Sequence, residues 1–159
     1  MKRLVVVATP VPLPDRFVRA RWPVHVTIVP NFVVDGAAAA AVISLARDAA
    51  RQNPEFTAEL GPQELFGPSR DVPVLLAEHS TFHELHAAIA GAVSLLPAFR
   101  PDLGEFWGAG YRPHTTVVSN SITPSARHIS ITNLAVVALG DAEARTLANC
   151  GLNADGALA

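Results

Sequence analysis

Hydrophobic residues gather in short runs separated by prolines and glycines, and most of these runs are typical of β-strands. Residues 4–8 form a continuous valine-rich run, which predicts a buried strand. Pro10, Pro12 and Pro14 follow and predict an extended connector, because proline has no backbone N–H to donate. The same pattern predicts further strands at residues 24–30, 56–60, 64–66, 72–78 and 129–139, and along the run that follows Tyr111.

Helical periodicity marks two longer stretches, one in each half of the chain. An alanine-rich helix is predicted over residues 35–52, with Asp35 as its N-cap. A second helix is predicted over residues 80–96, capped by Ser80 or Thr81. Its core face consists of apolar residues at helical spacing, namely Phe82, Leu85, Ile89, Val93 and Leu96.

The order of these elements predicts an α+β fold in one domain, residues 1–159, with two lobes. Each half carries one long helix and at least two strands, and the short links favour antiparallel pairing. Residues 15–21 predict a short helix, and the chain after Asp141 is expected to start helically. Residues 149–159 are expected to form a loose tail.

Composition and charge narrow the class of protein. Half of the 159 residues are hydrophobic, so the chain can build a core, and the formal net charge of −2 does not indicate a nucleic-acid coat protein. Arg16, Arg19, Arg21 and Arg112 nevertheless give a local positive charge that suits a phosphate ligand. Cys150 is the only cysteine, so there is no disulfide framework. The first apolar run is too short for a signal peptide and none is long enough to span a membrane, so we expect a cytoplasmic protein.

Two copies of a His-x-Thr pattern are the candidate chemistry, one in each half. His25 and Thr27 form the first copy, and His114 and Thr116 form the second. Side chains two residues apart in a strand share a face, so each copy places an imidazole beside a hydroxyl, with apolar bulk opposite. We expect the two copies to face each other across a cleft.

Two opposed imidazoles are suited to cleaving a phosphodiester. One takes a proton from the attacking water and the other gives a proton to the leaving oxygen, and both titrate near neutral pH. The threonine hydroxyls can donate hydrogen bonds to the non-bridging oxygens, where charge builds up in the transition state. This chemistry requires no metal, no cofactor and no covalent intermediate.

Other interpretations remain open. A single buried histidine is more often satisfied by a backbone carbonyl. His79, His83 and His86 recur at helical spacing, which is compatible with a metal site. The segment lacks the His-Glu-x-x-His pattern of zinc proteases.

The two motifs, and the Pro113-His114 junction, resemble the two-histidine phosphoesterase superfamily, the LigT-like RNA 2′,3′-cyclic phosphodiesterases and 2′-5′ RNA ligases. The resemblance implies two pseudo-symmetric lobes of largely antiparallel sheet, with a helix packed on each and a central cleft. It implies metal-independent opening of a 2′,3′-cyclic phosphate, or hydrolysis of a 2′-5′ phosphodiester, with His25 as general acid and His114 as base. The alternative on the same fold is a non-catalytic module that binds nucleotides or RNA ends.

Residues near the motifs are candidates for substrate contacts. Phe66, Trp107 and Tyr111 can stack on a base, and Arg112 can contact a phosphate. The expected partner is a nucleotide or an RNA terminus that carries a phosphodiester or cyclic phosphate, because the sequence lacks a lysine- or arginine-rich surface for long RNA. We expect a monomer that does not bind membranes.

Overall fold

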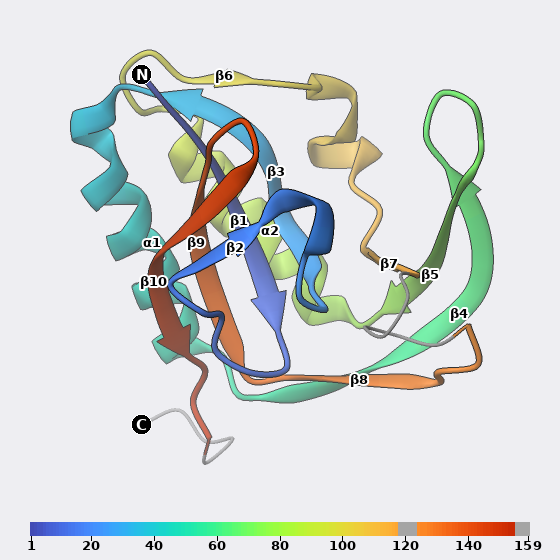
Figure 1. Ribbon diagram of the computed structural model, residues 1–159. Coiled ribbons are helices and arrows are strands. Elements are labelled where there is room, and N and C mark those ends of the chain that lie inside the picture. Colours follow the sequence, from blue (N-terminus) through green and yellow to red (C-terminus); the bar gives the residue numbers. More distant parts are fainter. Residues whose placement is uncertain (118–123, 155–159) are drawn as a thin grey trace.

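Two antiparallel sheets and two α-helices make up the fold (Figure 1). The computed structural model describes residues 1–117 and 124–154. The larger sheet has the strand order β2-β10-β9-β1-β3-β6 and the smaller has the order β7-β5-β4-β8, with every neighbouring pair antiparallel. The strands of the larger sheet are β1 (Lys2–Thr9), β2 (Arg16–Val18), β3 (Val26–Val34), β6 (Arg100–Pro101), β9 (Asn133–Leu139) and β10 (Glu143–Gly151). The strands of the smaller sheet are β4 (Phe56–Phe66), β5 (Val72–Glu78), β7 (His114–Thr116) and β8 (His128–Ile131). The predicted α+β class with antiparallel sheets is confirmed.

The valine-rich run forms β1, near the middle of the larger sheet, and both of its faces are covered. Leu4 and Val6 point into the main core, whereas Val5 and Val7 point into a smaller core on the opposite face. All four are at most 3% exposed. A run without polar alternation is therefore a strand packed on both sides.

Both helices lie over one face of the larger sheet. The first, α1 (Ala39–Gln52), packs on β9 and β10, and α2 (Ser80–Val93) packs on β3 and against α1. Asp35 caps the 3-10 turn that leads into α1, because its carboxylate accepts the backbone N–H of Ala37 at 3.2 Å. No helix among the described residues is long and apolar enough to cross a membrane.

The predicted cap of the second helix was wrong. His79 occupies the N-cap position, and its Nδ1 accepts the backbone N–H of Thr81 at 3.2 Å. An imidazole nitrogen without a proton is as good an acceptor as the hydroxyl of the expected Ser80 or Thr81. The helix also ends at Val93, three residues earlier than expected.

Pairing between distant strands accounts for further differences between the predicted and the observed bounds of the elements. Residues 16–18 form β2 followed by a 3-10 turn at Arg19–Arg21, and not an α-helix, because they pair with β10. The predicted strands at 56–60 and 64–66 are one strand, since a register shift between Leu60 and Gln63 accommodates the predicted turn. The single strand expected over 129–139 is interrupted before Asn133, and its two parts, β8 and β9, belong to different sheets.

The chain after Asp141 forms a strand where a helical start was expected. It pairs with β9 along its length as β10, so residues 149–151 end a strand and are not a loose tail. Leu152 follows and is only 5% exposed. Residues 155–159 of the predicted tail lie outside the described residues.

The two predicted motif strands lie side by side, although they belong to different sheets. β3 is a strand of the larger sheet, and β7 is an edge strand of the smaller one. The β4–β5 hairpin curls away from this junction, at the opposite end of the molecule from α1 (Figure 1). The fold thus brings the two His-x-Thr copies to the boundary between the sheets.

Candidate active site

Residues of both motifs line one hollow at the boundary between the sheets. His25 directly precedes β3, and His114 is the first residue of β7. The hollow is a pocket of about 300 Å³. His114 is not itself among the lining residues, but it directly precedes two of them on β7. The lining comes from both halves of the chain: Arg19, Ala20, Trp22, Pro23, Val24, His25, Thr115 and Thr116.

The two histidines are held in the same way. His25 Nδ1 lies 2.8 Å from the carbonyl oxygen of Pro23, and His114 Nδ1 lies 2.7 Å from that of Arg112. A carbonyl oxygen only accepts, so Nδ1 of each ring carries a proton and donates it. The neutral ring then has an unprotonated Nε2, which is the atom a general base requires.

The surroundings favour the neutral form of both rings. Burial lowers the pKa of His25 and of His114 below the ordinary value, while the bonds to Pro23 and Arg112 oppose that effect. A charge on His114 lowers the pKa of His25 further, so the two rings are close enough to interact electrostatically. The guanidinium of Arg112 likewise lowers the pKa of His114.

The side chains of the two motifs alternate between faces. Val26 and Ile28 are fully buried and Thr115 is 2% exposed, so these positions face the core. Thr27 and Thr116 are only partly buried. Thr116 lines the pocket beside His25, whereas Thr27 is not among the residues that line it.

Phe66 and Arg112 lie on the His114 side of the site. The Phe66 ring meets His114 edge-on, with 4.6 Å between ring centroids, and the guanidinium of Arg112 lies 5.0 Å from the Phe66 centroid. Arg112 also donates to both carboxylate oxygens of Glu64, at 3.0 and 3.1 Å. Arg112 can therefore reach a ligand only by sharing or leaving Glu64.

Tyr111 is placed differently from the prediction. It is 7% exposed, and its ring stacks on His86 with 4.0 Å between centroids and 2° between planes. Its hydroxyl donates to the backbone carbonyl of Thr27 at 2.7 Å. Because His86 covers one face of the ring, Tyr111 supports the site and does not offer a surface on which a ligand base can stack.

His86 completes a brace between the two motifs. Its Nδ1 donates to the carbonyl of Ile28 at 2.7 Å, and its Nε2 accepts the N–H of Gly108 at 2.9 Å. With Tyr111, it ties the start of β3 to the segment that leads into β7. The ring can make both bonds only when it is neutral, because one nitrogen donates and the other accepts. Burial lowers the pKa of His86, which agrees with a neutral ring.

The three histidines of the second helix have separate roles, which disfavours the metal-site interpretation. His79 caps the helix, His83 is exposed, and His86 belongs to the brace. Within residues 1–117 and 124–154, no three His, Cys, Asp or Glu side chains are grouped so that they could hold a metal ion. Cys150 is buried in the core, and burial raises its pKa, so it is a poor nucleophile.

Trp22 lines the pocket but was not predicted as a site residue, whereas Arg19, which also lines it, belongs to the arginines expected to suit a phosphate. The Trp22 ring lies 4.4 Å from His25 between centroids and packs edge-on against Phe17 at 4.7 Å. The sequence could have indicated Trp22 as a site residue, because it stands three residues before His25, as Tyr111 stands three residues before His114. Trp107, by contrast, packs in the core beside Phe32 and Phe99.

Two matched imidazoles held at the junction of two antiparallel sheets define a protein of the two-histidine phosphoesterase class. Comparison with protein families agrees, because residues 9–143 match the family described as the 2'-5' RNA ligase superfamily. The chain belongs to this superfamily. No curated protein matches the sequence.

Solved structures with the same fold share little sequence with this chain. TT0787 of Thermus thermophilus aligns with a TM-score of 0.65 at 16% identity, over 96% of this chain and 99% of its own. A structure described as a phosphoesterase gives 0.59 at 18% identity, over 96% and 99%. Escherichia coli LigT complexed with phosphate gives 0.56 at 16% identity, over 96% and 98%. LigT was also solved with 3'-AMP, NADP+ and ATP.

Proposed function

We propose that the protein is a phosphoric diester hydrolase that opens the 2′,3′-cyclic phosphate of a nucleotide or a short RNA end. The observation that carries this proposal is the matched pair of histidines. Each donates Nδ1–H to the carbonyl two residues earlier, so two basic Nε2 atoms are available in and beside one pocket. The membership of the superfamily supports the same chemistry.

In the proposed mechanism, His114 Nε2 takes a proton from water as its oxygen attacks phosphorus. The protonated His25 gives its Nε2 proton to the leaving ribose oxygen, so the P–O bond breaks without an unstable alkoxide. The hydroxyl of Thr116, which lines the pocket, donates to a non-bridging oxygen as charge builds there, and we assign the same role to Thr27, two residues after His25, although it does not line the pocket of the free protein. In the free protein burial lowers the pKa of His25, and the negative phosphate raises that pKa on binding.

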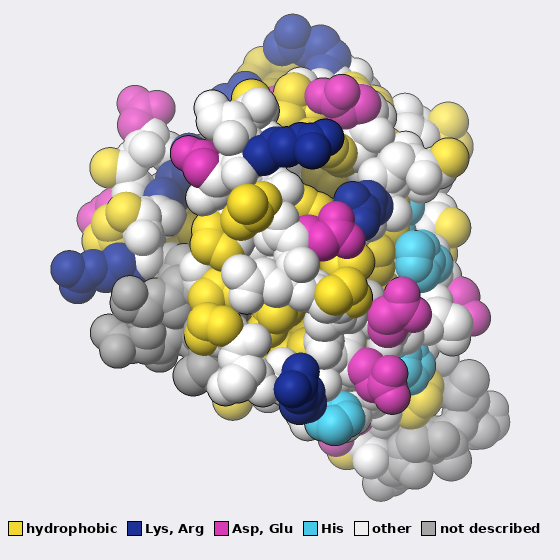
Figure 2. Space-filling view, turned by 90° about the vertical axis from the view of Figure 1, so that its right-hand side faces the viewer, with side chains coloured by type: hydrophobic (Ala, Val, Ile, Leu, Met, Phe, Trp, Pro, Cys, Tyr) yellow, Lys and Arg dark blue, Asp and Glu magenta, His cyan; other side chains and the backbone are white. Residues whose placement is uncertain are grey.

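The substrate is proposed to be small. The pocket of about 300 Å³ accommodates a phosphate and adjoining sugar rather than a long polymer. On the face that Figure 2 presents, basic and acidic side chains are interspersed with hydrophobic ones, and no continuous basic track is seen there. The LigT complexes with 3'-AMP and ATP also favour a nucleotide-sized ligand.

Phosphorus NMR of the four nucleoside 2′,3′-cyclic monophosphates, incubated with the protein, tests the proposal. We expect conversion to the 2′-phosphate, and the same assay with 2′-5′ dinucleotides and ADP-ribose cyclic phosphate ranks the alternatives. Binding without turnover of any of these substrates supports the non-catalytic module instead. The reverse reaction, ligation, is detected by supplying 2′,3′-cyclic phosphate ends together with 5′-hydroxyl ends and seeking a 2′-5′ linkage.

A further inference from the structure

A second and larger hollow, of about 460 Å³, lies at the far end of the larger sheet. Strand register explains its position. Leu4, Ala138, Arg145 and Arg16 stand opposite one another in a single row across β1, β9, β10 and β2. Side chains of residues paired in this way point to the same face of a sheet.

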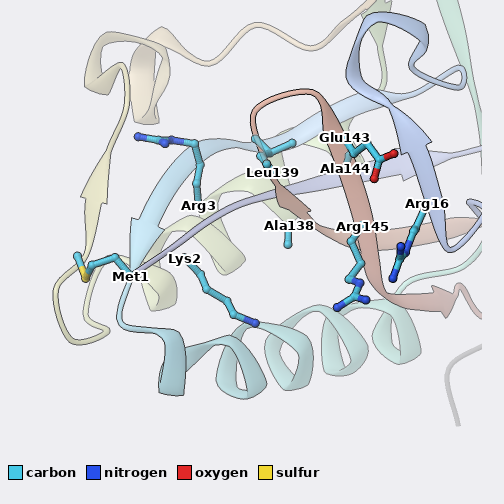
Figure 3. Close-up of a pocket in the computed structure, with 10 residues that line it drawn as sticks. Met1, Lys2, Arg3, Arg16, Ala138, Leu139, Glu143, Ala144 and Arg145 are labelled. Atoms are coloured by element: carbon cyan, nitrogen blue, oxygen red, sulfur yellow. The ribbon is translucent and has the colours of Figure 1, made fainter.

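Lys2 joins this row from the side. It stands two residues before Leu4 on β1, so its side chain lies on the same face. The small side chain of Ala138 lies between Leu4 and Arg145 in the row, and Gly140 directly follows the end of β9. Long cationic side chains around a floor of small residues produce a hollow walled by positive charge. Figure 3 shows Lys2, Arg16 and Arg145 extending toward the α1 side, and Arg3 pointing the other way.

The positive charges of the hollow are not neutralised by partners. Among the described residues, Lys2, Arg16 and Arg145 form no ion pair, whereas Arg3 is paired with Asp102 at 2.9 Å. Glu143 is the only acidic residue that lines this hollow in the described part of the chain. Arg145 and Arg16 stand directly opposite each other, and like charges in that position repel. A bound anion would relieve this repulsion.

We propose that this hollow binds a compact, multiply charged phosphate, of the size of a pyrophosphate or triphosphate group. Two guanidinium groups offer paired N–H donors to phosphate oxygens, and Lys2 adds a point charge. Within the described residues, the three unpaired cations, Lys2, Arg16 and Arg145, against the one carboxylate of Glu143 favour a ligand with two or more negative charges. A long RNA is disfavoured because the charges surround one hollow and do not form a track.

The hollow is separate from the histidine pocket. The two hollows share no lining residue. Lys2 stands six positions, or about 20 Å of strand, before Ala8, which pairs with Val26 beside His25. The hollows come closer at the end of β2, where Arg16 lines this hollow and Arg19, which lines the histidine pocket, donates to the carbonyl of Gly140 at 2.6 Å. The faces also differ, since Val7, the partner of Thr27, belongs to the core on the face away from α1. Occupation of this site therefore does not depend on the proposed hydrolysis.

Calorimetric titration with inorganic pyrophosphate at low ionic strength tests the proposal. We expect saturable binding of one pyrophosphate per chain, weakened at least about tenfold in Arg145→Ala and in Arg16→Ala, because each change removes one of the paired donor groups. Arg51→Ala is the matched control, because Arg51 is an exposed arginine of α1 outside the hollow, and it should bind as the wild type does. Circular dichroism confirms that each variant is folded, and His114→Ala should retain full binding.

Several outcomes would overturn the proposal. These are no saturable binding at millimolar pyrophosphate, equal weakening in Arg51→Ala, or loss of binding in His114→Ala, which would place the anion in the histidine pocket. Binding of an RNA oligonucleotide through Arg145 and Arg16, without binding of pyrophosphate, would overturn it in favour of a nucleic-acid surface.

Discussion

Replacing Tyr111 by phenylalanine removes one atom that joins the two halves of the candidate site. The hydroxyl of Tyr111 donates to the carbonyl of Thr27 at 2.7 Å, two residues after His25, while Tyr111 itself stands three residues before His114. The phenylalanine ring can keep the stack on His86. The substitution therefore tests the hydrogen bond with little change in packing.

The size of the effect follows from the burial of this bond. A net intramolecular hydrogen bond contributes about 0.5–1.5 kcal/mol, so the free energy of unfolding should fall by about 1 kcal/mol. In a chain of this length, that loss lowers the melting temperature by about 2–4 °C. Because the start of β3 loses a tether beside His25, we expect kcat to fall by about tenfold with KM nearly unchanged.

Thr132→Val is the matched control for Tyr111→Phe. Thr132 also donates from a partly buried hydroxyl to a backbone carbonyl, that of Pro10 at 2.8 Å, and it does not line the pocket. Both variants should lose similar stability in urea unfolding, but only Tyr111→Phe should lose kcat on a 2′,3′-cyclic nucleotide. If kcat changes equally in both variants, or in neither, Tyr111 does not position the histidines.

Three further predictions concern pH, the hydroxyls and metals. The pKa values of His25, His86 and His114 are lower in the folded than in the unfolded state, so protonation of these rings favours unfolding. The free energy of unfolding, measured in urea, should therefore fall as the pH drops from about 7 to about 5, by at most about 1.4 kcal/mol per pH unit per histidine. A free energy of unfolding that does not change over this pH range would refute the prediction. Thr116→Val should lower kcat at least about tenfold, because it removes a hydrogen bond to the transition state. The control Thr57→Val, at an exposed threonine of β4, should leave kcat unchanged. Equal kcat values in the two variants would count against the role of the Thr116 hydroxyl. Excess EDTA should leave turnover unchanged, because the imidazoles move the protons, and a rate restored only by added metal would contradict this.

Local sequence patterns predicted some elements well. The continuous valines of β1 and the apolar run of β5 give strong strand signals, and Val72–Glu78 was predicted with the observed bounds. Asp35 was predicted as a cap from its position before the alanine run, and it caps the turn before α1. In each case the residues that determine the element lie within the element itself or directly beside it.

Elements that depend on distant partners were not predicted. The residues of β10 have no clear period, and pairing with β9 makes them a strand. The break before Asn133 exists because the two flanking strands join different sheets, which no local pattern records.

The candidate site, too, could be predicted only as far as its features depend on residues near one another in sequence. The repeated His-x-Thr pattern singled out His25 and His114, and the fold brings both to the boundary between the sheets, close enough to interact electrostatically. An aromatic residue before each motif is compatible with stacking on a ligand or with bracing the fold. Only its neighbours distinguish the two, and for Tyr111 those neighbours are His86 and Thr27, distant in sequence.

The central claim, that two imidazoles act together on one phosphorus, is tested most directly by the turnover of His25→Ala, His114→Ala and the double variant on a 2′,3′-cyclic nucleotide. His128→Ala, an exposed histidine on β8, is the control. Each single change should lower kcat by about 100-fold or more, and the double variant should be only slightly slower than either, because the residues of one catalytic unit are not additive. Unchanged turnover in either single variant, or losses that multiply in the double variant, would contradict the account.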